Sequence, residues 1–101
     1  PNNARRAIAW CSFVSGKYEE ALKYYRMLLE QPSPKAHDWM NMGHVHFTMH
    51  QTKDAIAYYQ TSKSFEESHS AFLEKFNKDK NTLLKQGLSH EDIQIMLDLL
   101  V

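Results

Sequence analysis

The sequence contains few residues that break or cross-link a chain: three glycines, three prolines and one cysteine among 101 residues. Glycine and proline cluster at a few apparent joints, which favours helices joined by short turns. The single cysteine, Cys11, cannot form an internal disulfide, so we expect a reducing compartment such as the cytoplasm. The chain does not begin with methionine, and we interpret it as a piece of a longer protein.

An excess of charge and a long apolar run are also missing. Twelve Lys and Arg balance twelve Asp and Glu, so the formal net charge is zero. The lack of a basic excess argues against a nucleic-acid partner, and the lack of an acidic tail argues against a solvating role. The longest apolar run covers only a few residues, which excludes a membrane span in this segment. We therefore expect a protein or peptide partner.

What the sequence does contain is an internal repeat. When residues 2–35 are set above residues 36–69, similar residues coincide at a single offset of 34 with no insertion. A repeat of this length indicates a helical-repeat architecture. The coinciding pairs include Ala21 with Ala55, Leu22 with Ile56, Tyr24-Tyr25 with Tyr58-Tyr59, and Phe13 with Phe47.

Each repeat unit predicts two helices. Apolar residues recur at intervals of three and four on both sides of a turn, which lies at residues 15–17 in the first unit and 50–52 in the second. Pro32-Ser33-Pro34 ends the first unit, because proline removes a helical donor and restricts the residue before it. Ala9 and Gly43 are small where we expect the two helices of a pair to cross closely.

These features resemble the tetratricopeptide repeat (TPR) family over residues 2–67. The resemblance implies an all-α, right-handed α-solenoid of antiparallel helix pairs with about six helices. The predicted single domain, 1–101, holds one repeat at 2–35, a second at 36–67, and capping helices at 68–101. The residues that carry the resemblance are Ile8-Ala9, Gly16 through Ala21, Tyr25 through Leu28, Trp39, Met42-Gly43, Ala55 and Tyr59. The residues that depart from the family pattern are Arg5, Ser12, His46 and Thr52.

The last third of the chain does not repeat. Residues 68–86 predict one amphipathic helix that bends between Asn77 and Asn81. Gly87 is placed to end this helix in a left-handed conformation, and Ser89 is placed to cap a further helix. A stack of repeats needs such an end element to cover the apolar face of its final unit.

No residue pattern predicts catalysis. His46 and His50 are four residues apart and share a helical face, but the sequence offers no third ligand, so we predict no metal site. Cys11 lies in an apolar helix, where cysteine usually acts as a small hydrophobe. The chain has neither a Gly-x-Ser-x-Gly elbow nor a phosphate-binding glycine loop. We predict that the protein is not an enzyme and uses no cofactor.

The resemblance implies that the first helix of each pair lines a concave face that binds a partner. Aromatic side chains, Met and Arg are enriched at protein interfaces. We therefore predict a non-catalytic scaffold or adaptor module that binds a peptide or protein through this face. The predicted partner-binding residues are Asn3, Arg6, Trp10, Phe13, His37, Met40, Asn41, His44 and Phe47.

Two other interpretations of this face stay open. Some family members capture a peptide's C-terminal carboxylate there; Arg6 and Asn41 match parts of that arrangement, whereas Trp10 replaces its asparagine. Alternatively, the role is purely structural, as the cap of a longer repeat array or as a self-association module. In that case other helices, or another copy of the chain, cover Trp10 and Phe13.

Overall fold

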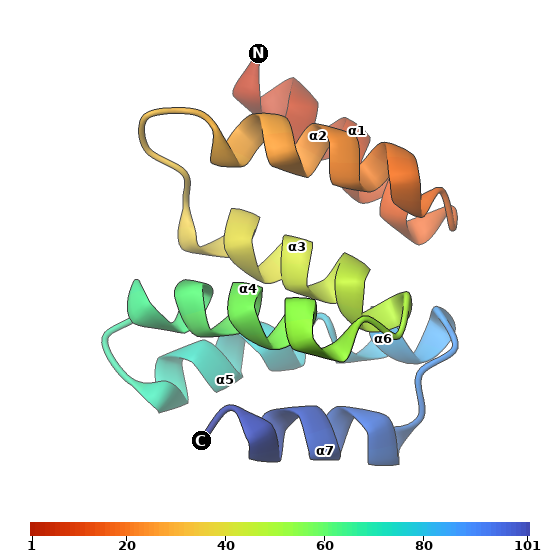
Figure 1. Cartoon of the computed structure of the whole chain (residues 1–101), viewed down its shortest axis with the longest axis vertical. Coiled ribbons are helices and arrows are strands. Elements are labelled where there is room, and N and C mark those ends of the chain that lie inside the picture. The colour runs from red at the N-terminus through yellow and green to blue at the C-terminus, as the bar shows by residue number, and fades with distance from the viewer.

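The computed structural model describes all 101 residues as seven α-helices without a strand, so the predicted all-α class is confirmed (Figure 1). The chain measures 35 × 30 × 22 Å along its principal axes. There are seven helices rather than about six, because the helix predicted over residues 68–86 is divided in two. The helices are α1 (Asn2–Val14), α2 (Tyr18–Leu29), α3 (Ala36–Thr48), α4 (Thr52–Ser64), α5 (His69–Lys78), α6 (Lys80–Lys85) and α7 (His90–Leu99).

The helix bounds repeat with the offset seen in the sequence. Helices α1 and α3 begin and end 34 residues apart, and so do the starts of α2 and α4. The closest packing joins α1 to α2 and α3 to α4, and α2 then packs on α3. The two turns also match: Gly16 has φ 77° in the first and His50 has φ 61° at the equivalent place in the second. A left-handed conformation costs a non-glycine residue about 1–2 kcal/mol, which the packing of α3 against α4 offsets.

Each helix pair closes around a buried tyrosine. Tyr25 of α2 and Tyr59 of α4 are both almost wholly buried, at equivalent positions of the repeat. Tyr59 lies directly against the backbone of α3, since a Cβ added to Gly43 would be 2.7 Å from two of its ring atoms. Glycine is therefore required at this crossing, whereas the first pair accommodates Ala9.

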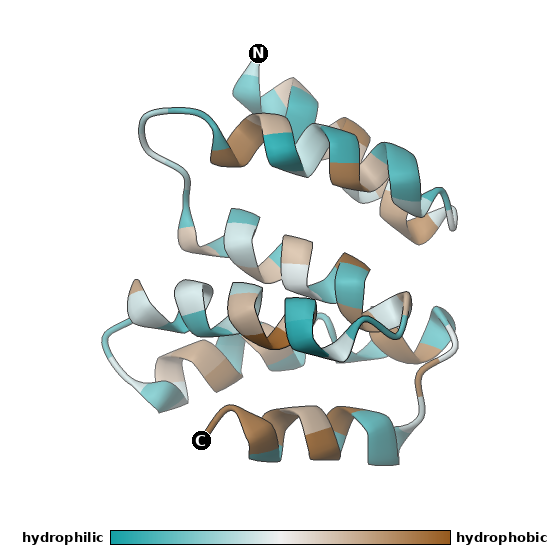
Figure 2. Ribbon diagram, in the orientation of Figure 1, coloured by the Kyte–Doolittle hydropathy of each residue, from teal (hydrophilic) through white to brown (hydrophobic).

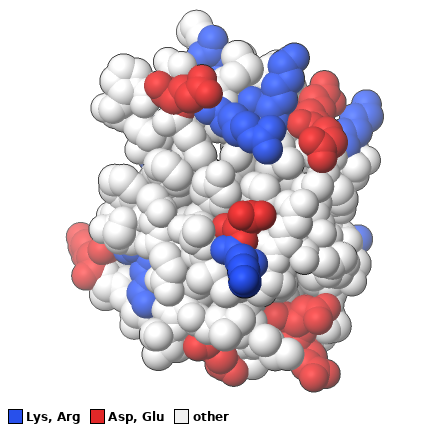
Figure 3. Space-filling view, viewed as in Figure 1, with Lys and Arg blue, Asp and Glu red and all other residues white.

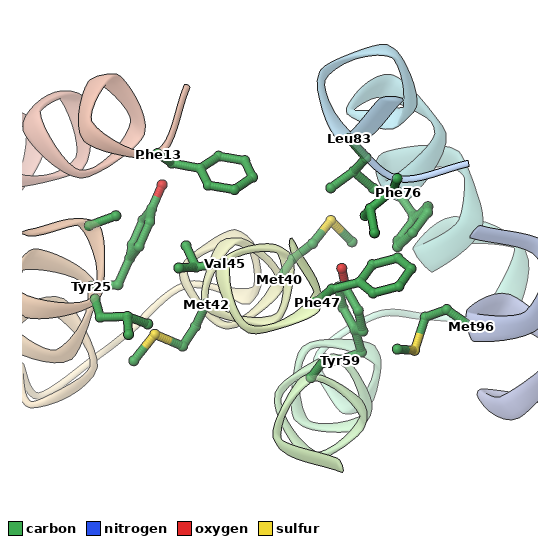
Figure 4. Close-up of a cluster of buried hydrophobic side chains, with 14 of the residues drawn as sticks. Phe13, Tyr25, Met40, Met42, Val45, Phe47, Tyr59, Phe76, Leu83 and Met96 are labelled. Atoms are coloured by element: carbon green, nitrogen blue, oxygen red, sulfur yellow. The ribbon is translucent and has the colours of Figure 1, made fainter. Parts of the chain in front are cut away.

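One continuous core connects all parts of the chain. Nineteen buried apolar residues form a single cluster that extends from Ala9 of α1 to Leu100 at the end of α7. Phe13 and Tyr25 lie at one side of this cluster, and Phe76, Leu83 and Met96 lie at the other (Figure 4). Apolar and polar residues alternate along the helices, and α7 is apolar over most of its length (Figure 2).

The predicted helix over residues 68–86 breaks at Asp79. The backbone N–H of Asp79 donates to Phe76 O, a tightened turn, while its carboxylate lies 3.0 Å from Nε2 of His44 on α3. This side-chain contact fixes the break at Asp79, which lies within the predicted bend. The terminal signals are confirmed: Gly87 has φ 103°, and Ser89 and Asp92 exchange hydrogen bonds in a capping box at the start of α7.

The terminal helices fold back over α3 and reach the first helix pair. Phe72 and Phe76 of α5 contact the ring of Tyr59, and Phe76 also contacts His44. At the end of α6, the side-chain amide of Gln86 donates to Val14 O (3.0 Å) and accepts from the hydroxyl of Tyr18 (2.7 Å). Residues about 70 positions apart thus meet, and the side of α3 that faces α5 is covered.

Candidate protein-interaction surface

The structure divides the nine predicted partner-binding residues into two groups. Asn3 and His37 are exposed, and Arg6, Trp10 and Asn41 are half-buried. The other four are buried in the core of this chain, so their prediction as contacts for a partner is wrong for this conformation: Phe13, Met40, His44 and Phe47. Phe13 packs on Trp10 and Tyr18 within the first helix pair. His44 and Phe47 are covered from the terminal segment, by Phe76 and by Leu88 and Met96 respectively.

Arg6, the one cation predicted on this face, is occupied within the chain. Its Nε and Nη2 donate to the two carboxylate oxygens of Asp38 at 2.8 Å each, and the Asp38 side chain is completely buried. Burial by itself raises the pKa of Asp38. The hydrogen bonds from Arg6 and from Lys35 N–H, with the charge of Arg6, outweigh it and lower that pKa below its ordinary value. Because an internal carboxylate already holds Arg6 in a bidentate pair, capture of a peptide carboxylate by this guanidinium has no support.

His44 belongs to a buried polar network and not to an open site. Its Nδ1 lies 2.6 Å from the hydroxyl of Tyr59, and its Nε2 lies 3.0 Å from the carboxylate of Asp79. Burial raises the pKa of Tyr59 well above its ordinary value, and the charge of Asp79 adds to this. The hydroxyl of Tyr59 therefore stays protonated. The network fixes the positions of α3, α4 and the α5–α6 break relative to one another.

The histidine pair predicted to share a helical face is separated by structure. His46 is buried, its Nδ1 lies 2.6 Å from Oε1 of Gln51, and its ring stacks on Tyr58 with 7° between the planes. His50 lies in the turn after α3. No group of three or more His, Cys, Asp and Glu side chains is arranged to hold a metal ion.

The outer face of α1 exposes apolar side chains next to a hollow. Ile8 is 42% exposed and Cys11 is exposed, whereas their repeat equivalents on α3, Met42 and Val45, are completely buried. The difference arises because α2 packs on α3 and no helix of this chain packs on the same side of α1. A hollow of about 300 Å³ opens there, lined by Ala7, Ile8, Cys11, Ser12, Ser15, Lys17 and Glu20.

A second apolar surface lies on α7, at the opposite end of the molecule (Figure 1). Ile95 and Leu99 are 52% and 50% exposed, and Val101 beyond the helix is almost fully exposed. Ile95 and Leu99 line a smaller hollow of about 120 Å³ between α7 and the α3–α4 turn, whose other lining residues include Phe47, His50, Leu88 and Met96.

The two ends of the molecule differ in charge. Residues 1–35 contain six Lys and Arg and three Asp and Glu, a net charge of +3, whereas residues 36–101 contain six and nine, a net charge of −3. On the face seen in Figure 3, basic side chains gather at the α1–α2 end, and the side chains at the α7 end are acidic. The net charge of the whole chain is therefore zero although its charges are unevenly distributed along the molecule.

Sequence reasoning did not identify either end surface. Ile8 and Leu99 follow helical periodicity like buried residues, and nothing in a single sequence says which apolar stripe lacks a covering helix. For α1, the repeat offset is the one signal that could have indicated it, because it makes α1 the counterpart of α3, on which α2 packs.

Comparisons of the chain with models of known families, with curated proteins and with solved structures found no match. None of the seven helices combines the length and the apolar character needed to cross a membrane.

Proposed function

We propose that this chain is a non-catalytic, TPR-like helical-repeat module that binds another protein chain through the outer face of α1. The observation that carries the proposal is the exposure of Ile8 and Cys11, where the equivalent residues of α3 lie completely buried under α2. Helix α1 thus exposes the face that, on α3, packs against a helix.

The internal packing of α2 on α3 indicates the kind of partner. On α3, the covering element is α2, an amphipathic helix whose apolar side faces α3. We therefore expect a partner helix with apolar residues at intervals of three and four. The small side chains Ala4, Ala7 and Cys11 allow such a helix to approach closely. Because α1 is held rigidly against α2, binding requires little ordering of this chain.

Site-specific crosslinking tests this proposal, because Cys11 is the only cysteine. Cys11→Ser combined with Ser15→Cys places a photocrosslinker at the edge of the hollow. In a lysate of the source cells, we expect a covalent adduct with another protein chain that disappears when Ile8→Glu is added. Cys11→Ser combined with Phe65→Cys is the matched control, since Phe65 is exposed and lines neither hollow. Equal adducts from both positions, or an adduct that survives Ile8→Glu, would contradict the proposal.

The inner side of α1 supports a second candidate surface, the concave face that the TPR resemblance implies. Trp10 stays half-exposed there, and Asn3 lies two helical turns before it on the same side of α1. Trp10→Ala discriminates between the candidates: loss of partner binding with Trp10→Ala but not with Ile8→Glu would assign the partner to the inner face. Phe47→Ala is not useful for this purpose, because Phe47 is buried and its truncation reports stability.

A further inference from the structure

We propose that the outer face of α1 binds the α7 face of a second copy of this chain, so that copies associate head to tail. This inference rests on the function proposed for α1 and names its partner. It is carried by three properties of the two faces: their positions, their shapes and their charges.

The two faces lie at opposite ends of the molecule. The α1–α2 pair forms one end along the longest axis, and α7 forms the other (Figure 1). A copy therefore cannot satisfy its own α1 face with its own α7. When one copy uses its α7 face, its α1 face stays open, so the contact is heterologous and continues into an open chain or a ring.

The two faces have complementary shapes. At α1, the small residues Ala7, Cys11 and Ser15 line a hollow of about 300 Å³ in which Ile8 is the largest apolar side chain. On α7, Ile95 and Leu99 are half-exposed and one helical turn apart, so they form a raised rim on the α7 side of the smaller hollow. A rim of branched aliphatic side chains fits against a hollow whose floor on α1 is made mostly of small side chains, which is how helices pack closely.

The charges favour this pairing over a symmetric one. Helix α1 contains Arg5 and Arg6 and no acidic residue, whereas α7 contains Glu91, Asp92 and Asp98 and no Lys or Arg. Since Arg6 is bound to Asp38, the cations left for a partner are Lys17 at the rim of the hollow and Arg5, whose Nη1 also donates to Oδ1 of Asn2 (3.0 Å). Glu20 at the same rim accepts a hydrogen bond from Ser12 (3.1 Å). A contact of α1 with α1, or of α7 with α7, would instead bring like charges together.

Sedimentation of the purified chain at increasing concentration tests the inference. We expect the mass of the wild-type chain to rise with concentration, and to fall toward that of a monomer in about 1 M salt, where charge attraction is screened over about 3 Å. Ile8→Glu and Leu99→Glu should each raise the dissociation constant about tenfold or more, because each places a charge in an apolar contact. Both positions are exposed within one copy, so neither variant buries a charge in the monomer. Phe65→Glu, which adds the same charge outside both faces, should change nothing.

A mixture of the two variants is the decisive measurement. Ile8→Glu keeps an intact α7 face and Leu99→Glu keeps an intact α1 face, so a 1:1 mixture should form dimers although each variant alone stays monomeric. If the mixture stays monomeric while the wild type associates, the contact is not head to tail and the inference is overturned. A wild-type chain that remains monomeric up to about 1 mM also overturns it.

The thiol of Cys11 gives a second readout that needs no variant. It is exposed in one copy, so its rate of reaction with a thiol reagent should fall as the protein concentration rises. A rate that is independent of concentration would contradict burial of the α1 face. If self-association fails these tests but the Ser15→Cys crosslink still captures another protein in an Ile8-dependent manner, only the identity of the partner is wrong and the proposed function stands.

Discussion

The two helix pairs of this chain have similar sequences and different surroundings. Helix α3 is covered by α2 on one side and by α5 on another, and every residue from Met42 to Thr48 is buried. In α1, whose outer face no helix of this chain covers, only Ala9, Ser12 and Phe13 are buried. The comparison teaches that burial in such a stack is set by the place of a helix in the order of elements, and less by the residues of that helix.

The pairs also differ in how their central tyrosines are satisfied. In the second pair the hydroxyl of Tyr59 bonds His44, which in turn bonds Asp79. In the first pair the residue equivalent to His44 is Trp10, which has no acceptor to offer, and the buried hydroxyl of Tyr25 has no partner within the protein. The tyrosine hydroxyl of the inner pair therefore belongs to a buried polar network, whereas the tyrosine hydroxyl of the outer pair has no polar partner.

The largest loss of stability should come from breaking the ion pair between Arg6 and Asp38, which joins the first helix pair to the second. Asp38→Ala leaves Arg6 without its carboxylate and the N–H of Lys35 without its acceptor. Removing one partner of a buried pair leaves the other uncompensated, so we expect a loss of about 3 kcal/mol in the free energy of unfolding. Urea denaturation of both proteins measures it. Glu67→Ala, at an exposed loop residue, should stay within about 0.5 kcal/mol of the wild type.

The same ion pair gives a pH dependence whose direction is fixed. Because the pKa of Asp38 is lower in the folded chain than its ordinary value of about 3.9, its contribution is fully present above that value and is lost as the pH falls through the folded pKa. The stability difference between the wild type and Asp38→Asn should therefore shrink as the pH is lowered from about 5 toward 2. An unchanged difference over this range would show that the charge of Asp38 does not stabilise the fold.

A smaller effect should follow from removing the hydroxyl of the inner tyrosine. Tyr59→Phe keeps the ring that packs on Gly43 but leaves Nδ1 of the buried His44 without a partner. An unsatisfied buried polar group costs about 1–3 kcal/mol, so we expect a loss near 2 kcal/mol, with the helical circular dichroism unchanged. A loss below about 0.5 kcal/mol would mean that His44 finds another partner, and the polar network would then not distinguish the two pairs.

Much of this difference between the pairs could not be predicted from the sequence. The repeat offset predicts where α1 to α4 begin and which side of each helix is apolar, because periodicity and turn residues are local signals. The break at Asp79 and the burial of Phe47 depend on which helix returns to which surface, and that is decided by long-range contacts such as those of Gln86 with Val14 and Tyr18. The concave face was assigned to a partner because the sequence does not reveal that this chain covers part of it.

The smallest expected effect is a gain in stability, and it comes from removing the hydroxyl of the outer tyrosine, Tyr25. The hydroxyl of Tyr25 is buried without a partner in the protein, and burial, together with the charges of Asp38 and Asp79, raises its pKa so that it stays neutral. Tyr25→Phe removes an unsatisfied polar atom and keeps the ring, so we expect the free energy of unfolding to rise by up to about 1 kcal/mol. A parallel urea titration of Tyr25→Phe and Tyr59→Phe measures both signs under identical conditions. If the two variants lose the same stability, residue 10 and residue 44 are energetically equivalent, and the exchange of tryptophan for histidine would not explain why only the inner tyrosine has a polar partner.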